Sequence, residues 1–134
     1  MFLVKYHELM SACLELDELQ IDMPVTIYLT DSSTLFYIHE VITSEDDMKD
    51  VIDDENCPIL LVSENNTTHI TYNDLFNALN KFNIYALNND ISVYFGDNDE
   101  FYGVSDFMLM SETPIHIRHE LEEKISYECP VLIC

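Results

Sequence analysis

The feature that most constrains the fold of this 134-residue chain is an internal repeat. Shifted by 66 positions, the sequence keeps its apolar and aromatic character, so that residues 25–29 (VTIYL) align with residues 91–95 (ISVYF). After six extra residues in the second copy, residues 57–61 (CPILL) align with residues 129–133 (CPVLI). Similarity at a fixed period is typical of one structural unit used more than once. We therefore predict two tandem units, a first half and a second half of the chain.

The first half (residues 1–66) and the second half (residues 67–134) each carry the pattern helix, strand, strand, helix, strand. Apolar residues three or four positions apart indicate the first helix of each half. They are Tyr6, Leu9, Met10, Cys13 and Leu16 in the first half, and Tyr72, Leu75, Phe76, Leu79 and Phe82 in the second. Thr71 and Asp74 form a capping pair that favours a helix start at this point.

The strands follow from alternation and from apolar runs. Alternating residues over 25–29 predict one strand, Asp31-Ser-Ser33 predicts a turn, and residues 35–42 predict one returning strand. Uninterrupted apolar runs at 57–62 and 129–133 predict strands that are buried on both faces, near the middle of the sheet.

A second helix is expected in each half between the hairpin and the last strand. In the first half, Thr43 or Ser44 favours a helix start, because acidic residues follow in the first turn. In the second half, Thr113-Pro114 favours a helix that ends near Lys124. The expected fold class is α+β, with two α-β-β-α-β repeats that are related by pseudo-two-fold symmetry and packed as one compact body.

The charge balance bounds the function. The net charge is −21, yet 48% of the residues are hydrophobic, so we expect a folded core with the acids outside. Neither a targeting segment nor a membrane-spanning run is visible. Cys13, Cys57, Cys129 and Cys134 show no CxxC spacing, which favours buried thiols and a reducing, cytoplasmic compartment; a disulfide between two of them is the alternative.

The acids are densest in the connector of the first half, which is the candidate partner-binding site. It contains Glu45, Asp46, Asp47, Asp50, Asp53, Asp54 and Glu55. Such a surface repels phosphate, which argues against direct binding of DNA, RNA or an anionic membrane and favours a basic protein as partner. One hypothesis is that the carboxylates imitate a phosphate backbone and block a nucleic-acid-binding protein. The alternative is a solvated face that keeps the protein soluble.

Two clusters resemble metal sites only loosely. Asp97-Asn-Asp-Glu100 offers oxygen ligands, but it lacks the ligand spacing, central glycine and distal glutamate of a calcium loop, and a hairpin turn explains these residues equally well. His116, His119, Glu120 and Glu123 lie three or four positions apart, which also suits an exposed helix face. We expect no metal and no cofactor.

No pattern of covalent catalysis stands out. The chain has no GxSxG elbow and no glycine-rich phosphate loop, so we expect no catalytic residue and no enzyme. Tyr6, Tyr28, Tyr72 and Tyr94 occupy equivalent positions of the repeat, and we expect them to pack at the edge of the core with their hydroxyls in water. The predicted function is a non-enzymatic acidic binding protein. A structural or assembly accessory protein is the second alternative, and an enzyme whose site is not visible in the sequence is the third.

The small size, the composition rich in Asn, Asp, Ile and Tyr, and Asp22-Met-Pro-Val25 followed by a strand and a hairpin resemble the small acidic accessory proteins of tailed phages and of marine environmental sequence. The resemblance covers mainly residues 4–63 and carries no functional residue. It implies an accessory or host-takeover role in the cytoplasm of a host cell, in which an acidic inhibitor would be at home.

Overall fold

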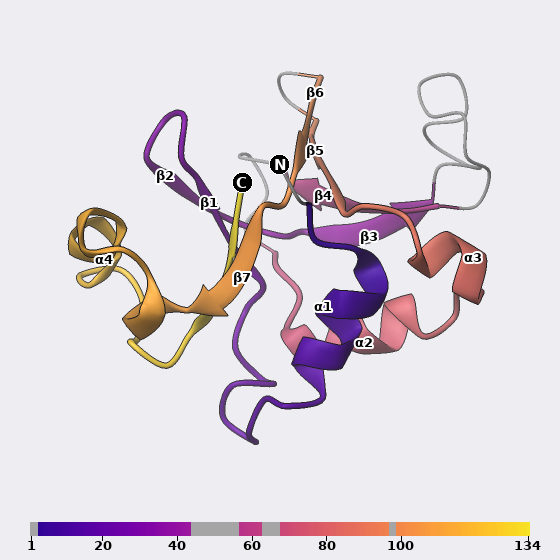
Figure 1. Cartoon of the computed structure of the whole chain (residues 1–134), viewed down its shortest axis with the longest axis horizontal. Helices are drawn as coiled ribbons and strands as arrows, with labels where there is room; N and C mark the ends of the chain where they lie inside the picture. Colours follow the sequence, from indigo (N-terminus) through magenta and orange to yellow (C-terminus); the bar gives the residue numbers. More distant parts are fainter. Residues whose placement is uncertain (1–2, 44–56, 63–67, 97–98) are drawn as a thin grey trace.

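The computed structural model describes residues 3–43, 57–62, 68–96 and 99–134, which form an α+β protein with two four-stranded sheets (Figure 1). The helices are α1 (Tyr6–Cys13), α2 (Tyr72–Leu79), α3 (Ile84–Leu87) and α4 (Ile115–Leu121), with one 3-10 turn, η1 (Met110–Glu112). The strands are β1 (Thr26–Leu29), β2 (Thr34–Tyr37), β3 (Glu40–Thr43), β4 (Pro58–Val62), β5 (Ser92–Phe95), β6 (Glu100–Gly103), β7 (Asp106–Leu109) and β8 (Pro130–Ile133).

Each sheet combines strands from both halves of the chain. The first sheet has the order β2-β1-β8-β7 and the second sheet has the order β3-β4-β5-β6. The two inner strands of each sheet are parallel, with Ile27 opposite Leu132 in the first sheet and Leu60 opposite Val93 in the second. The outer strands are antiparallel to their neighbours. The parallel pairs therefore join segments that are far apart in the sequence.

The expectation of one returning strand over residues 35–42 is wrong. This segment divides into β2 and β3, which belong to different sheets. The Ile38 N–H donates to the Val25 carbonyl at 3.0 Å, and the next N–H, that of His39, donates to the Leu61 carbonyl at 2.8 Å. Since consecutive residues bond to different sheets, the chain crosses between the sheets here. The residues of a strand-forming segment do not indicate which strand it pairs with, so the sequence pattern could not reveal the break.

The prediction that the two apolar runs form central, buried strands is confirmed, although they lie in two sheets instead of one. β8 and β4 are inner strands, and β8 is buried throughout. Alternate residues of β1 and β8 face two different cores. Tyr28, Val131 and Ile133 pack with Ile117 and Leu121 of α4, whereas Ile27 and Leu132 belong to the main core with α1 and α2.

The first helices of the two halves lie where the apolar spacing predicts them, and α1 contacts α2 (Figure 1). The predicted cap of α2 is confirmed. The Thr71 hydroxyl accepts from the Asp74 N–H at 3.2 Å, and the Asp74 carboxylate accepts from the Thr71 N–H at 3.0 Å. The sequence pattern does not predict the short helix α3. The helix expected after Thr43 lies outside the described residues.

Tyr6 and Tyr72 are fully buried, so the expectation that their hydroxyls are in water is wrong. The Tyr6 hydroxyl donates to the Pro58 carbonyl at 2.5 Å and accepts from the Ser92 N–H at 3.0 Å, and the Tyr72 hydroxyl donates to the Pro130 carbonyl at 2.6 Å and accepts from the Thr26 N–H at 3.4 Å. Each hydroxyl thus satisfies main-chain groups of inner strands from both halves of the chain. Burial raises the pKa of both tyrosines well above the usual range.

Three of the cysteines, Cys13, Cys57 and Cys129, are buried as predicted, and Cys134 is half-buried. Burial raises the pKa of the Cys13 thiol to about 12. Within the described ranges, no helix has the length and apolar character needed to cross a membrane.

Candidate functional site

The acidic connector predicted as the partner-binding site lies outside the described residues, so the structure places none of its members. They are Glu45, Asp46, Asp47, Asp50, Asp53, Asp54 and Glu55. The described residues show where the remaining acids lie and which of them line a groove.

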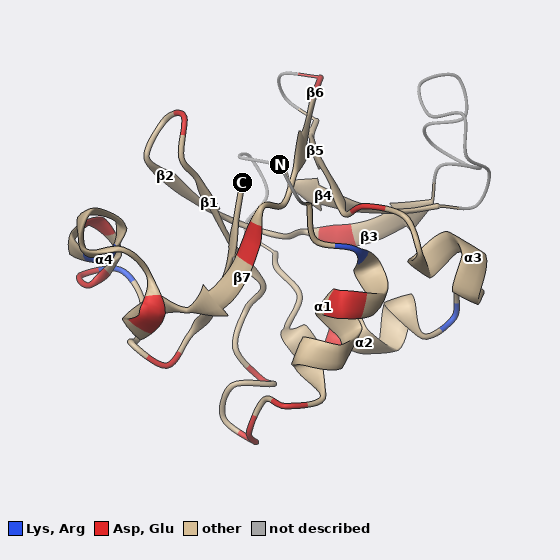
Figure 2. Ribbon diagram, in the orientation of Figure 1, with Lys and Arg blue, Asp and Glu red and all other residues tan. Residues whose placement is uncertain are grey.

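All aspartate and glutamate side chains in the described part of the chain are exposed. None of them forms an ion pair with a Lys or Arg of the same ranges; the ion pair found there joins His119 Nδ1 to Glu122 Oε1 at 3.5 Å. Figure 2 shows these acids at the tip of the β1–β2 hairpin, on α1 and α4, at the start of β7 and in the loops below α1, with few basic residues between them. The described surface therefore carries many more acids than bases, and it attracts cations.

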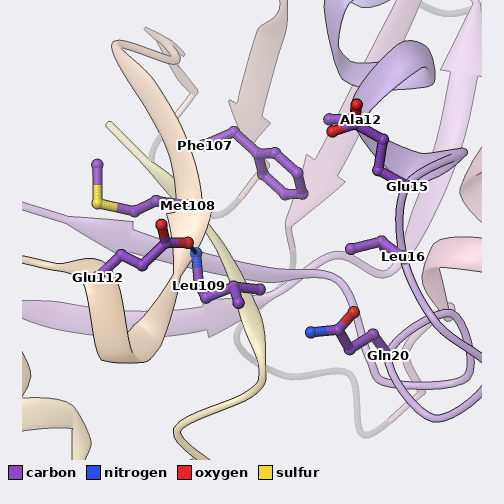
Figure 3. A pocket seen from close by; sticks show the side chains of 8 residues that line it. All are labelled: Ala12, Glu15, Leu16, Gln20, Phe107, Met108, Leu109 and Glu112. Atoms are coloured by element: carbon purple, nitrogen blue, oxygen red, sulfur yellow. Dashed lines mark hydrogen bonds between the residues drawn. The ribbon is translucent and has the colours of Figure 1, made fainter.

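A groove between the end of α1 and strand β7, called the α1–β7 groove below, combines acidic and apolar side chains (Figure 3). Its volume is about 260 Å³. It is lined by Ala12, Glu15, Leu16 and Gln20 on one wall and by Phe107, Met108, Leu109 and Glu112 on the other. In Figure 3 the side chains of Leu16, Phe107 and Leu109 surround the hollow, while Glu15 and Glu112 lie on opposite walls.

Hydrogen bonds fix both walls of the α1–β7 groove. The buried Gln20 accepts from the Asp17 N–H at 3.0 Å and donates to the Glu128 carbonyl at 3.1 Å. On the facing wall, Glu112 Oε1 accepts from the Leu109 N–H at 3.2 Å. Side-chain bonds of this kind hold a loop in one conformation, so the groove is largely preformed.

A second groove, the α2–β3 groove, lies between α2 and β3 and has a volume of about 320 Å³. It is lined by Val41, Thr43, Ala78, Lys81 and Phe82. These residues lie 66 positions from five residues of the α1–β7 groove, and Lys81 takes the position that corresponds to Glu15. The two grooves therefore present opposite charges at matching positions.

The turn considered as a metal site is engaged in hydrogen bonds where it is described. Asp99 Oδ1 accepts from the Tyr94 hydroxyl at 2.7 Å, and Glu100 Oε2 accepts from the Tyr102 hydroxyl at 2.7 Å, whereas Asp97 and Asn98 lie outside the described residues. The side-chain hydrogen bond to Asp99 raises the pKa of Tyr94.

The histidines and glutamates at α4 are not brought together either. His119 pairs with Glu122, and Glu120 accepts a hydrogen bond from the Tyr28 hydroxyl. The pKa of Tyr28 is raised mainly by burial, and the hydrogen bond to Glu120 raises it further. Among the residues that the structure places, no three His, Cys, Asp or Glu side chains gather as a metal site.

Sequence reasoning missed the α1–β7 groove, because its walls come from opposite halves of the chain and Glu15, Phe107 and Glu112 belong to no motif. The groove offers two carboxylates, those of Glu15 and Glu112, beside apolar side chains, and its lining includes no Ser, Thr, Cys, His or Lys. Comparisons with protein-family models, with curated proteins and with solved structures find no match to this chain.

Proposed function

We propose that this chain is a non-enzymatic binding protein that presents its acidic surface to a basic protein. One observation carries the proposal: the described carboxylates are exposed, and no Lys or Arg of the described ranges pairs with them. Such carboxylates remain available to the Lys and Arg side chains of a partner. The same charge speeds the approach of a basic surface and repels the phosphates of nucleic acid and of anionic lipid.

In the finer form of this proposal, the carboxylates imitate the phosphates of a nucleic acid, and the partner is a nucleic-acid-binding protein. The acidic connector, Glu45 to Glu55, then contributes the densest part of the contact surface. The support is the density of its acids, because counterions gather there and are released when a basic partner binds.

A second candidate is a structural or assembly accessory protein with no charged target, active in the cytoplasm of a host cell. It is favoured by Figure 2, in which the described acids lie on separate hairpins, helices and loops instead of following one continuous element. Acids spread in this way keep a protein soluble whether or not it has a basic partner. The resemblance to phage accessory proteins supports the same role.

We also propose that the two halves are copies of one unit related by an approximate two-fold axis, with strands exchanged between the two sheets. Each copy has a first helix, three short strands (β1–β3 or β5–β7) and a last strand (β4 or β8), so the unit carries one strand more than the α-β-β-α-β pattern expected from the sequence. Matching contacts support this proposal. Tyr6 and Tyr72 each bind one inner strand of their own half and one of the other half. Ser33 and Asp99, at equivalent hairpin turns, have positive φ values of 53° and 54°. An experimental structure in which the halves differ in strand order would contradict it.

The experiment is affinity capture from a bacterial lysate at low and raised salt, with identification of what elutes. We expect a basic nucleic-acid-binding protein that is released as salt rises, because screening weakens its attraction to the acids. Replacing Asp46, Asp47, Asp50 and Asp53 by Asn should weaken this capture. The matched control replaces Asp22, Asp31, Glu40 and Glu123 by their amides, which removes the same charge elsewhere. Equal capture by parent and connector variant would favour the accessory role.

A further inference from the structure

The α1–β7 groove carries carboxylates and apolar side chains at different places in its lining, whereas a general acidic surface offers charge alone. Its apolar lining consists of Leu16 on one wall and Phe107 and Leu109 on the other, all half-buried, while Glu15 and Glu112 are exposed at opposite walls (Figure 3). At about 260 Å³ it is small compared with pockets for drug-sized ligands, which span roughly 300–1,000 Å³. A single side chain fits this size better than a complete cofactor does.

We propose that the α1–β7 groove binds a Lys or Arg side chain, flanked by apolar residues, from the basic protein partner. This inference rests on the proposed function and deepens it. Lys and Arg carry an aliphatic stem that packs on apolar surface and a cationic head that seeks carboxylates. In the groove, the stem lies on Leu16 and Leu109, and the head lies between Glu15 and Glu112.

The ring of Phe107 adds to the fit, because a guanidinium or ammonium group over an aromatic face is attracted to it. The carboxylates are also available. The Glu15 carboxylate makes no hydrogen bond or ion pair with another described residue, and Glu112 uses Oε1 for the Leu109 N–H, which leaves Oε2 for a ligand. Since both walls are already fixed by hydrogen bonds, little ordering is needed on binding.

The α2–β3 groove provides a comparison within the molecule. It has a similar apolar lining, but Lys81 takes the place of Glu15. A cationic side chain is repelled by Lys81, so it should bind the α1–β7 groove in preference to the α2–β3 groove.

The test is a titration of the ¹⁵N-labelled protein with the peptide acetyl-Leu-Arg-Leu-amide, followed by amide NMR. We expect shifts for residues 15–20 and 107–112, smaller shifts for 41–43 and 78–82, and a Kd that rises with salt. Acetyl-Leu-Gln-Leu-amide and acetyl-Gly-Arg-Gly-amide are the controls, and both should bind more weakly, because one lacks the cation and the other lacks the apolar flanks. Equal binding of the Gln peptide would overturn the proposal, since the groove would then select apolar segments regardless of charge.

Two charge reversals distinguish binding in the α1–β7 groove from a general effect of the protein's net charge. Glu15→Lys places in the α1–β7 groove the charge that Lys81 places in the α2–β3 groove. We expect it to raise the Kd of the Arg peptide at least about fivefold, because it replaces an attraction by a repulsion. Glu123→Lys changes the net charge equally but lies outside the groove, and we expect less than about a twofold effect. Both side chains are exposed, so both variants should retain the parent's amide spectrum.

The outcomes distinguish this site from the proposed function. Equal weakening by Glu15→Lys and Glu123→Lys would overturn the groove and leave a general acidic contact surface in place. Groove resonances that shift when the protein alone is concentrated would identify a second copy as the occupant and would also overturn it. If the amide resonances of the groove residues do not shift with the Arg peptide, the site is refuted. The capture experiment tests separately whether the protein has a basic partner.

Discussion

Replacing Tyr6 by Phe removes one oxygen atom from the middle of the protein. The side chain is fully buried, and its hydroxyl donates to the Pro58 carbonyl at 2.5 Å and accepts from the Ser92 N–H at 3.0 Å. Phe keeps the ring but leaves both main-chain groups without this partner. A buried polar group left unsatisfied costs about 1–3 kcal/mol, and the Pro58 carbonyl keeps only a weak contact with Cys57 Sγ at 3.5 Å. Loss of both hydrogen bonds should therefore lower the free energy of unfolding by about 3 kcal/mol.

Thermal unfolding followed by circular dichroism measures this loss. For a chain of this size, about 1 kcal/mol corresponds to roughly 3–5 °C, so the Tm should fall by about 10 °C. Tyr85→Phe is the matched control, because Tyr85 is 83% exposed and its hydroxyl is in water. Its Tm should equal that of the parent. If Tyr6→Phe also melts within about 2 °C of the parent, the argument that this hydroxyl satisfies the core is refuted.

Three further predictions concern stability. Thr71→Ala removes the oxygen that accepts the Asp74 N–H, and urea unfolding should show a loss of about 1 kcal/mol. Sodium chloride should raise the Tm, because it screens repulsion among unpaired carboxylates; a flat response between low and moderate salt would mean that they are already well separated. The third concerns pH. Burial raises the pKa of Cys13 from 9.0 to about 12, so the unfolded chain ionises first. Stability is retained below pH 9 and lost as the pH rises toward 12, by up to about 1.4 kcal/mol per unit. The urea midpoint of Cys13→Ala should fall less steeply over this window.

Local patterns predicted the elements whose signal lies within one segment. The apolar spacing from Tyr72 to Leu79 marks one helix face, and Thr71 with Asp74 marks its start; the structure has both. The apolar runs that end at Val62 and Ile133 form inner strands, as predicted. Such a run indicates an inner strand because a strand buried on both faces has no alternating polar residues. In each case the residues that decide the structure are close in sequence.

The predictions that were wrong needed knowledge of distant partners. The strand-forming run over residues 35–42 continues through Ile38 and His39 without a turn residue, yet these two neighbours bond to different sheets. The hydroxyls of Tyr6 and Tyr72 are buried because inner strands lie over them, and no local pattern reports a strand from elsewhere in the chain. The acidic connector stays a prediction from charge alone.

The sequence by itself determined the α+β class, the first helices, the central strands and the strongly negative charge, because helix period, apolar runs and formal charge are local properties. Only the tertiary structure decided that each sheet takes strands from both halves, and that Glu15 and Leu16 after α1 meet Phe107 and Glu112 across one groove. Strand pairing and pocket walls depend on contacts between residues far apart in the chain. Such contacts are chosen by the packing of the whole core, in which each segment competes for the same neighbours.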